Sequence, residues 1–82
     1  MSFSLNKKNL IFKWYEEKTV NKGSNSFILT NVVPAGATLE IFDEKYGLEW
    51  SKVLHWNISG QVITLTETAL TETLKFKIYC FV

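Results

Sequence analysis

The stretch Leu74-Lys75-Phe76-Lys77-Ile78-Tyr79-Cys80-Phe81-Val82 decides the fold, because apolar residues alternate along it with Lys and aromatic residues. Successive side chains of a β-strand point to opposite faces, so an alternation with a period of two predicts a strand. The positions predicted to face a core are Leu74, Phe76, Ile78, Cys80 and Val82. The positions predicted to face outward are Lys75, Lys77, Tyr79 and Phe81.

A hairpin signal precedes this strand. Residues 55–66 read His-Trp-Asn-Ile-Ser-Gly-Gln-Val-Ile-Thr-Leu-Thr, two β-rich runs on either side of Ser59-Gly60. Glycine supplies the positive φ that a two-residue hairpin turn needs, so a β-hairpin is predicted around this pair. Its apolar positions are Trp56, Ile58, Ile63 and Leu65.

Two segments nearer the N-terminus are rich in the β-branched and aromatic residues that fit a pleated surface. Residues 10–15 are predicted to form a strand with Leu10, Phe12 and Trp14 on one face, although their spacing also fits a short amphipathic helix. Residues 27–33 are predicted to form a second strand, ended by a proline turn.

Residues 37–43 alternate again, and residues 46–56 fit two structures. In the first segment, Leu39 and Ile41 are predicted to face opposite to Thr38, Glu40 and Phe42. In the second, a short helix would carry Tyr46, Trp50, Val53 and Leu54 on one face. Gly47 would cost that helix about 1 kcal/mol. A strand through Leu48, a loop at 51–52 and a new strand from Leu54 fit equally well.

Short strands about 8–12 residues apart, with turn residues between them, predict an all-β fold. We expect a small antiparallel β-sandwich, jelly-roll-like or immunoglobulin-like, of about six to seven short strands. A length of 82 residues predicts one domain spanning 1–82. The polar connection at 67–72 has one apolar anchor, Leu70.

The charge balance argues against nucleic acid as a partner. The formal net charge is +1, and all nine cationic residues are Lys. Arg, the residue best suited to bidentate recognition of phosphate and guanine, is absent from the sequence. Apolar runs are far shorter than the ~20 residues of a membrane span. Residues 1–10 have no apolar stretch before a cleavage site, so neither a membrane anchor nor a signal peptide is predicted.

Residues that could carry catalysis are few. His55 is the one histidine, which excludes a multi-histidine metal site, and it is expected to lie exposed or in an interface. The four glycines are isolated, so no phosphate-binding loop is predicted. The carboxylates stand mostly beside Lys or in turns and are expected to be solvated. The single Cys80 is expected to be a core residue. We therefore predict no enzyme, no cofactor and no metal.

Two aromatic groups are candidate binding residues. Tyr79, Phe81 and Tyr15 are candidates for an oligomer interface, because some rings of so small a domain must lie outside its single core. Scattered exposure of single apolar residues is the alternative. A second group could form a platform for sugar rings, with core packing as the alternative for its members. They are Tyr46, Trp50 and Trp56.

The C-terminal half resembles a pattern found in bacteriophage tail, fibre and head-decoration proteins. Gly47-Leu48-Glu49-Trp50 leads to the aromatic strand and Ser-Gly hairpin of 56–65 and then to the alternating strand at 74–79, and the turn at 33–36 also fits. The resemblance implies a non-enzymatic virion component that is made in the host cytoplasm. Such a component would form a homo-oligomer, preferably a trimer, and would contact other virion proteins.

Two other functions compete with a virion structural role. One is a module that binds a carbohydrate or a host protein through its aromatic residues, which makes a glycan a possible partner. The other is a small phage inhibitor of a host enzyme.

Overall fold

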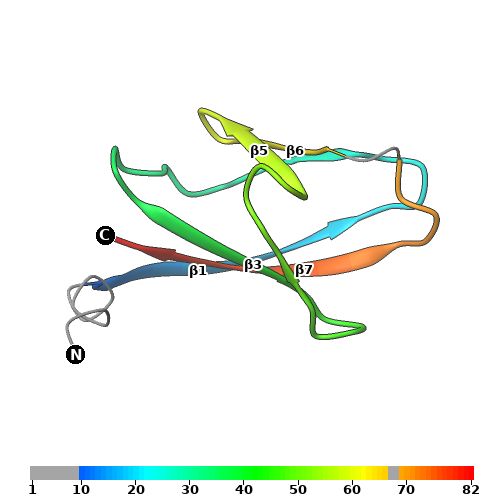
Figure 1. Ribbon diagram of the computed structural model, residues 1–82, viewed down its shortest axis with the longest axis horizontal. Helices are drawn as coiled ribbons and strands as arrows, with labels where there is room; N and C mark the ends of the chain where they lie inside the picture. The colour runs from blue at the N-terminus through cyan, green and yellow to red at the C-terminus, as the bar shows by residue number, and fades with distance from the viewer. Residues whose placement is uncertain (1–9, 67–68) are drawn as a thin grey trace.

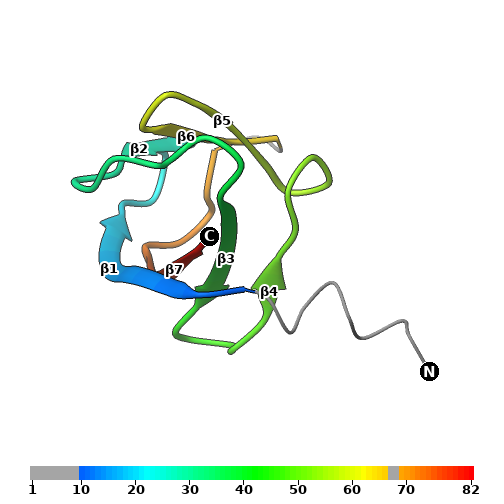
Figure 2. The same ribbon diagram turned by 90° about the vertical axis from the view of Figure 1, so that its left-hand side faces the viewer.

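The computed structural model describes residues 10–66 and 69–82. The elements are β1 (Phe12–Val20), β2 (Ser26–Ile28), β3 (Thr38–Asp43), β4 (Glu49–Trp50), β5 (Trp56–Ser59), β6 (Val62–Leu65) and β7 (Leu74–Phe81). They form two antiparallel sheets, ordered β1-β7-β3-β4 and β2-β6-β5, that stack as two layers (Figures 1 and 2). The predicted small β-sandwich is confirmed. No helix long and apolar enough to cross a membrane occurs in these two ranges.

The long strand β7 organises the larger sheet, because it lies between β1 and β3 and pairs with both. The pairing of the chain is nested: β1 pairs with β7 in one sheet, and β2 pairs with β6 in the other. In a constant-type immunoglobulin domain the first and last strands belong to different sheets. The strand order here is therefore nearer to the jelly-roll alternative.

The core lies between the two sheets, and β7 alternates as predicted. Leu74, Phe76, Ile78 and Cys80 are all buried, and the first three belong to one core cluster with residues of the smaller sheet such as Ile63. The other buried apolar residues are Val20, Phe27, Leu29, Ile41, Trp56 and Leu65. The prediction for Val82 is wrong: it lies just beyond β7 and is 39% exposed.

The predicted hairpin joins β5 and β6, with its turn one residue later than expected. Ser59 pairs with Val62, which leaves Gly60 and Gln61 as the loop. Gly60 has φ +62°, and Gln61 does not have a positive φ. A positive φ at the first loop residue alone is what a type II′ turn requires. The predicted apolar positions Trp56, Ile63 and Leu65 are buried, and Ile58 is partly buried against the core.

The first strand corrects the sequence prediction in length and in facing. It extends to Val20, and its register shifts between Phe12 and Trp14. Because this irregularity inserts Lys13, Phe12 pairs with Phe81 on the outer face, whereas Trp14 pairs with Cys80 on the inner face. Phe12 and Trp14 therefore do not share a face.

The predicted strand at 27–33 is also too long, because β2 ends at Ile28. Its partner β6 begins at Val62, and beyond that pair one more backbone bond follows, from Leu29 N–H to the carbonyl of the loop residue Gln61 at 2.7 Å. Beyond it, the carboxylate of Glu16 accepts the backbone N–H of Thr30 (2.9 Å) and of Asn31 (3.1 Å). A side chain thus satisfies donors that a neighbouring strand would otherwise bond.

The ambiguous segment 46–56 follows the strand alternative with other bounds, because the first strand begins at Glu49, after Leu48, and the second begins at Trp56, whereas Leu54 lies in a turn. The short strand β4 pairs with β3, and a turn then leads to β5. In this turn Val53 has φ +74°, which is unusual for a β-branched residue. Gly47 has φ +68°, a conformation that glycine adopts without strain. Leu70 anchors the connection before β7, because it packs against the core.

Candidate functional site

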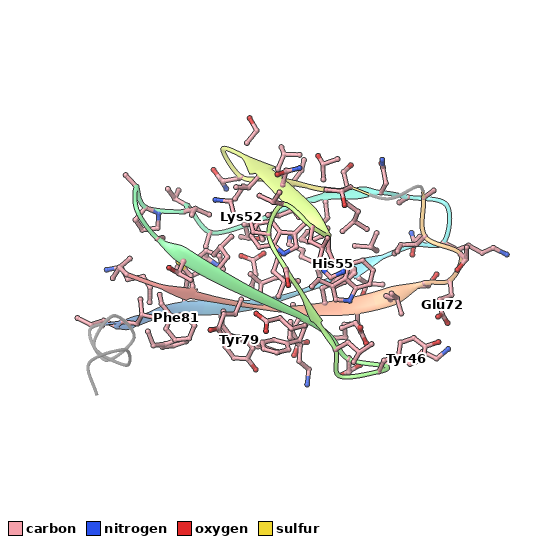
Figure 3. The ribbon with its side chains drawn as sticks, viewed as in Figure 1. Tyr46, Lys52, His55, Glu72, Tyr79 and Phe81 are labelled. Atoms are coloured by element: carbon pink, nitrogen blue, oxygen red, sulfur yellow. The ribbon has the colours of Figure 1, made fainter. Side chains whose placement is uncertain are left out.

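The outer side of the four-stranded sheet carries a cluster of aromatic rings. The cluster, here called the outer aromatic face, consists of Phe12, Tyr15, Phe42, Tyr79 and Phe81. These rings come from three adjacent strands, β1, β7 and β3. Figure 3 shows Tyr79 and Phe81 on the side of the sheet opposite to β5 and β6. The structure therefore brings together all the residues predicted for an oligomer interface, Tyr15, Tyr79 and Phe81.

The rings of this face pack against one another rather than into the core. The centroids of Tyr15 and Tyr79 are 4.8 Å apart. Phe12 meets Phe81 at 6.0 Å, and Phe42 meets Tyr79 at 6.0 Å, both edge to face. Phe12 is 56% exposed and Tyr15 is 38% exposed, so the cluster presents apolar surface to solvent. Such side-by-side rings are a preassembled apolar patch.

The charges beside the outer aromatic face pair with one another. Lys75 Nζ lies 2.9 Å from a carboxylate oxygen of Glu17, and Lys77 Nζ lies 3.9 Å from Glu44. The hydroxyl of Tyr15 donates to Glu17. This hydrogen bond, together with desolvation and the negative charge of Glu17, raises the pKa of Tyr15 to about 12. The hydrogen bonds that Glu17 accepts from Tyr15 and from Lys75 hold the pKa of Glu17 below its ordinary value.

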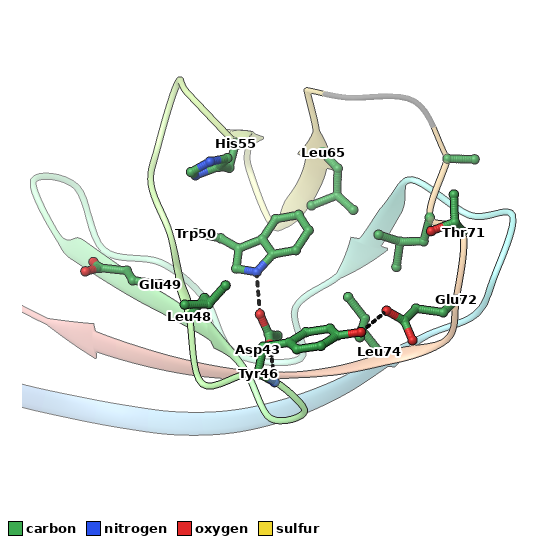
Figure 4. A pocket seen from close by; sticks show the side chains of 12 residues that line it. Asp43, Tyr46, Leu48, Glu49, Trp50, His55, Leu65, Thr71, Glu72 and Leu74 are labelled. Atoms are coloured by element: carbon green, nitrogen blue, oxygen red, sulfur yellow. Dashed lines mark hydrogen bonds between the residues drawn. The ribbon is translucent and has the colours of Figure 1, made fainter.

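A second candidate site is an open cleft of about 590 Å³ beside β4, here called the β4 cleft (Figure 4). Its walls come from the turn after β3, from β4, from the end of β6 and from the connection into β7. The lining residues are Asp43, Tyr46, Leu48, Glu49, Trp50, His55, Leu65, Ala69, Leu70, Thr71, Glu72 and Leu74. Leucine side chains, the rings of Tyr46 and Trp50, and a few polar groups therefore face one space.

Asp43 fixes the base of the β4 cleft. It is 2% exposed, and its carboxylate accepts the backbone N–H of Tyr46 (2.5 Å) and of Gly47 (3.2 Å). Its other oxygen accepts Trp50 Nε1–H at 2.9 Å. The indole of Trp50 also meets the Phe76 ring edge to face at 5.1 Å. The Trp50 ring is thus held in place from two sides.

The rim of the β4 cleft holds a fixed carboxylate. Glu72 accepts hydrogen bonds from Lys45 Nζ and from the Tyr46 hydroxyl, both at 2.6 Å. These bonds keep the pKa of Glu72 below its ordinary value, and they raise the pKa of Lys45 and of Tyr46. The Lys45 ammonium lies 5.4 Å from the centre of the Tyr46 ring.

His55 is half-buried beside Trp50, with ring centroids 5.8 Å apart. Its Nδ1 accepts the backbone N–H of Ser51 at 2.8 Å. An accepting Nδ1 places the proton of the neutral imidazole on Nε2. The Nδ1 bond therefore fixes the orientation of the His55 ring beside Trp50.

The predicted aromatic platform is present only in part. Tyr46 and Trp50 line the same cleft, but Trp56 is 2% exposed and its indole donates to the carbonyl of Trp50. Core packing therefore explains Trp56, and the platform does not include it. Cys80 is fully buried, as predicted, and burial raises the pKa of its thiol.

Sequence reasoning missed Asp43, Glu72 and the structural use of Glu16. It assigned the carboxylates to solvated positions, whereas Asp43 is buried and the side chain of Glu16 is 9% exposed. Asp43 carried a usable signal: an Asp at the end of a strand, followed by a turn with a glycine, is typical of a side chain that bonds its own turn. No comparable signal marks Glu72. Within the described ranges no group of three or more His, Cys, Asp or Glu side chains could hold a metal ion.

Comparison of the chain with protein families, with curated proteins and with solved structures finds no match.

Proposed function

We propose that this protein is a non-enzymatic structural subunit that binds further copies of itself through the outer aromatic face. The observation that supports this function is the set of rings from β1, β7 and β3 that pack side by side and stay partly exposed. A second copy would cover this apolar surface. A chain of 82 residues also gains more from such burial than a larger domain does.

Charge favours a second copy as the partner. Two basic residues near the rings have acidic neighbours in the same chain: Lys75 lies beside Glu17 on β1, and Lys77 lies beside Glu44 in the turn after β3. The whole chain has a formal net charge of +1, so two copies repel each other little as they approach. Two apposed outer faces would not bring unpaired like charges together at these positions.

The setting proposed for this self-association is a virion. It comes from the resemblance of the C-terminal half to phage tail, fibre and head-decoration proteins, which also favours a trimer. Other virion proteins would then be further partners. A monomeric inhibitor of a host enzyme, by contrast, would not need a self-binding face.

The test combines sedimentation with circular dichroism on a double variant, Tyr79→Ser with Phe81→Ser. Both rings are partly exposed, so each has at most about a third of its area left to bury, worth about 1–2 kcal/mol before ordering costs are subtracted. We expect the wild type to be oligomeric at micromolar concentration and the variant to be monomeric with an unchanged β spectrum. Tyr46→Ser, which removes an exposed ring outside this face, is the matched control and should leave the mass unchanged.

A second variant separates assembly from folding. Phe12→Ser lies on the edge strand β1, and its ring is 56% exposed, so it should weaken assembly with little effect on the fold. A wild type that stays monomeric at high micromolar concentration would refute the proposal. So would an unchanged mass in both variants, because the interface would then lie elsewhere.

A further inference from the structure

We propose that the β4 cleft binds one neutral sugar ring, and that this binding is independent of self-association. The outer aromatic face and the β4 cleft use different side chains, so either proposal can fail without the other. The inference rests on the shape of the cleft, on its two fixed aromatic residues and on the polar groups at its rim.

The size of the cleft suits a small ligand. Its volume of about 590 Å³ falls within the roughly 300–1,000 Å³ of small-molecule sites. Leu65, Leu70 and Leu74 supply apolar wall on the side of the smaller sheet and of β7. Such walls accept the C–H faces of a sugar ring and exclude water from around them.

The two aromatic residues are positioned before any ligand arrives. Trp50 is held by its bond to Asp43 and by its contact with Phe76. Tyr46 is held by its hydroxyl bond to Glu72, yet 55% of it is exposed. A site that is already ordered loses less conformational entropy on binding. The fixed rings are therefore suited to stacking against a flat ligand such as a pyranose.

The polar groups of the cleft match hydroxyls, which both donate and accept. Glu72 is a fixed acceptor, and the hydroxyl of Thr71 can serve either way. A ligand that carried only acceptors or only donors would leave some of these groups unpaired.

Charge selects a neutral sugar over an acidic one. Among the residues that the structure describes, those that line the cleft include Asp43, Glu49 and Glu72 but no Lys. The nearby Lys45 is already bonded to Glu72. An acidic sugar would place its carboxylate beside Glu72, whose nearby cation is already bonded to it, and like charges repel.

The three tryptophan indoles provide built-in reporters for the test. Trp50 Nε1–H bonds to Asp43 at the cleft, and Trp56 Nε1–H bonds to the Trp50 carbonyl directly behind it. Trp14 lies on β1, at the opposite edge of the sheet from β4, and its Nε1–H bonds to the Val32 carbonyl. Each indole proton gives one resonance in a proton–nitrogen correlation spectrum, so Trp14 serves as an internal control.

The titration uses glucose, galactose, mannose and N-acetylglucosamine, each up to tens of millimolar, with glucuronic acid and choline as contrasting probes. We expect at least one neutral sugar to shift the Trp50 resonance saturably, with a millimolar dissociation constant, while Trp14 stays in place. Glu72→Ala should weaken this binding at least tenfold. Glu44→Ala, which removes a carboxylate on the outer side of the sheet, is the matched control and should not change it.

Three results would overturn the proposal. One is that none of the four sugars moves the Trp50 resonance. Another is equal movement of Trp50 and Trp14, which would indicate a solvent effect. The third is a shift with choline alone, which would make the cleft a cation site. If Glu72→Ala fails to fold, Thr71→Val tests the same rim of the cleft. Unchanged sugar binding in Thr71→Val would also count against the proposal.

Discussion

Replacing Phe76 by Ala tests the packing on which both proposed surfaces depend. Phe76 lies near the middle of β7 and is fully buried. Its ring stacks on Phe27 with centroids 5.7 Å apart and an interplanar angle of 12°, and it meets Trp50 edge to face at 5.1 Å. It therefore joins the two sheets and also supports the base of the β4 cleft.

The expected loss follows from these contacts. Truncation of a buried Phe to Ala costs roughly 3–5 kcal/mol, as lost transfer free energy and as the cavity left behind. The two aromatic contacts of about 0.5–1.5 kcal/mol each place this site toward the upper part of that range. A chain of 82 residues has a total stability of about 4–12 kcal/mol. Phe76→Ala should thus remove a third or more of the free energy of unfolding.

Urea denaturation of wild type and variant, followed by tryptophan fluorescence, measures this difference. With a slope of about 1–1.5 kcal/mol per molar urea, the midpoint should fall by roughly 3–5 M. Lys77→Ala, one position along β7 on the outer face, is the control and should change stability by no more than about 0.5 kcal/mol. A loss below about 1 kcal/mol for Phe76→Ala, with a large loss for Lys77→Ala, would mean that the register of β7 is shifted by one residue.

Two further predictions concern the loops. Burial alone would raise the pKa of Glu16, but the hydrogen bonds from Thr30 and Asn31 lower it overall. The ionised Glu16 therefore stabilises the fold above the ordinary glutamate range, and this stability is lost as the pH falls through the lowered pKa. Glu16→Gln should therefore lower the free energy of unfolding by about 1.5–3 kcal/mol at pH 7. It should also reduce the loss of stability at acidic pH, measured by urea denaturation at a series of pH values. An unchanged loss at acidic pH would contradict this role of Glu16. Val53→Gly should raise the melting temperature slightly, because Val53 has φ +74° and is 71% exposed. Val53→Ala does not relieve the positive φ and should not raise the melting temperature. Equal melting temperatures of the two variants would argue against backbone strain at this position.

The sequence predicted the strands whose alternation is uninterrupted. On β7 every second residue from Leu74 to Cys80 is apolar, and that pattern alone located the core and the outer rings Tyr79 and Phe81. The hairpin of β5 and β6 was recognisable from Gly60 for the same reason: local backbone chemistry and the side-chain pattern agree there.

The first strand could not be bounded in this way, because its second half is charged. Glu16, Glu17 and Lys18 have low β propensity, and they are stable in β1 through distant partners. Glu16 bonds the loop at 30–31, and Glu17 pairs with Lys75 on β7. Long-range contacts of this kind override local propensity. The irregularity at Lys13 likewise leaves no mark in the alternation of residue types.

The β4 cleft was predictable only in its aromatic residues. Tyr46 and Trp50 stood out by residue type, whereas Glu72 joins them from a segment more than twenty residues away. The burial of Trp56 depends on how β5 packs across the sandwich. Composition could not separate a ring that lines a cleft from a ring that fills the core, because both are large and apolar.

The two proposed surfaces would reinforce each other in an assembly. A single sugar ring bound in an open cleft gives millimolar affinity, which is too weak to hold a particle on a surface. Self-association through the outer aromatic face, however, would place several β4 clefts on one oligomer, since each subunit contributes its own. When one site of the oligomer is bound, the linked sites are held at a high effective concentration near the surface. The overall affinity then exceeds that of a single site by roughly 10²–10⁴. Removal of Tyr79 and Phe81 should then abolish tight binding to a glycan-coated surface while it leaves the millimolar binding of the free sugar unchanged.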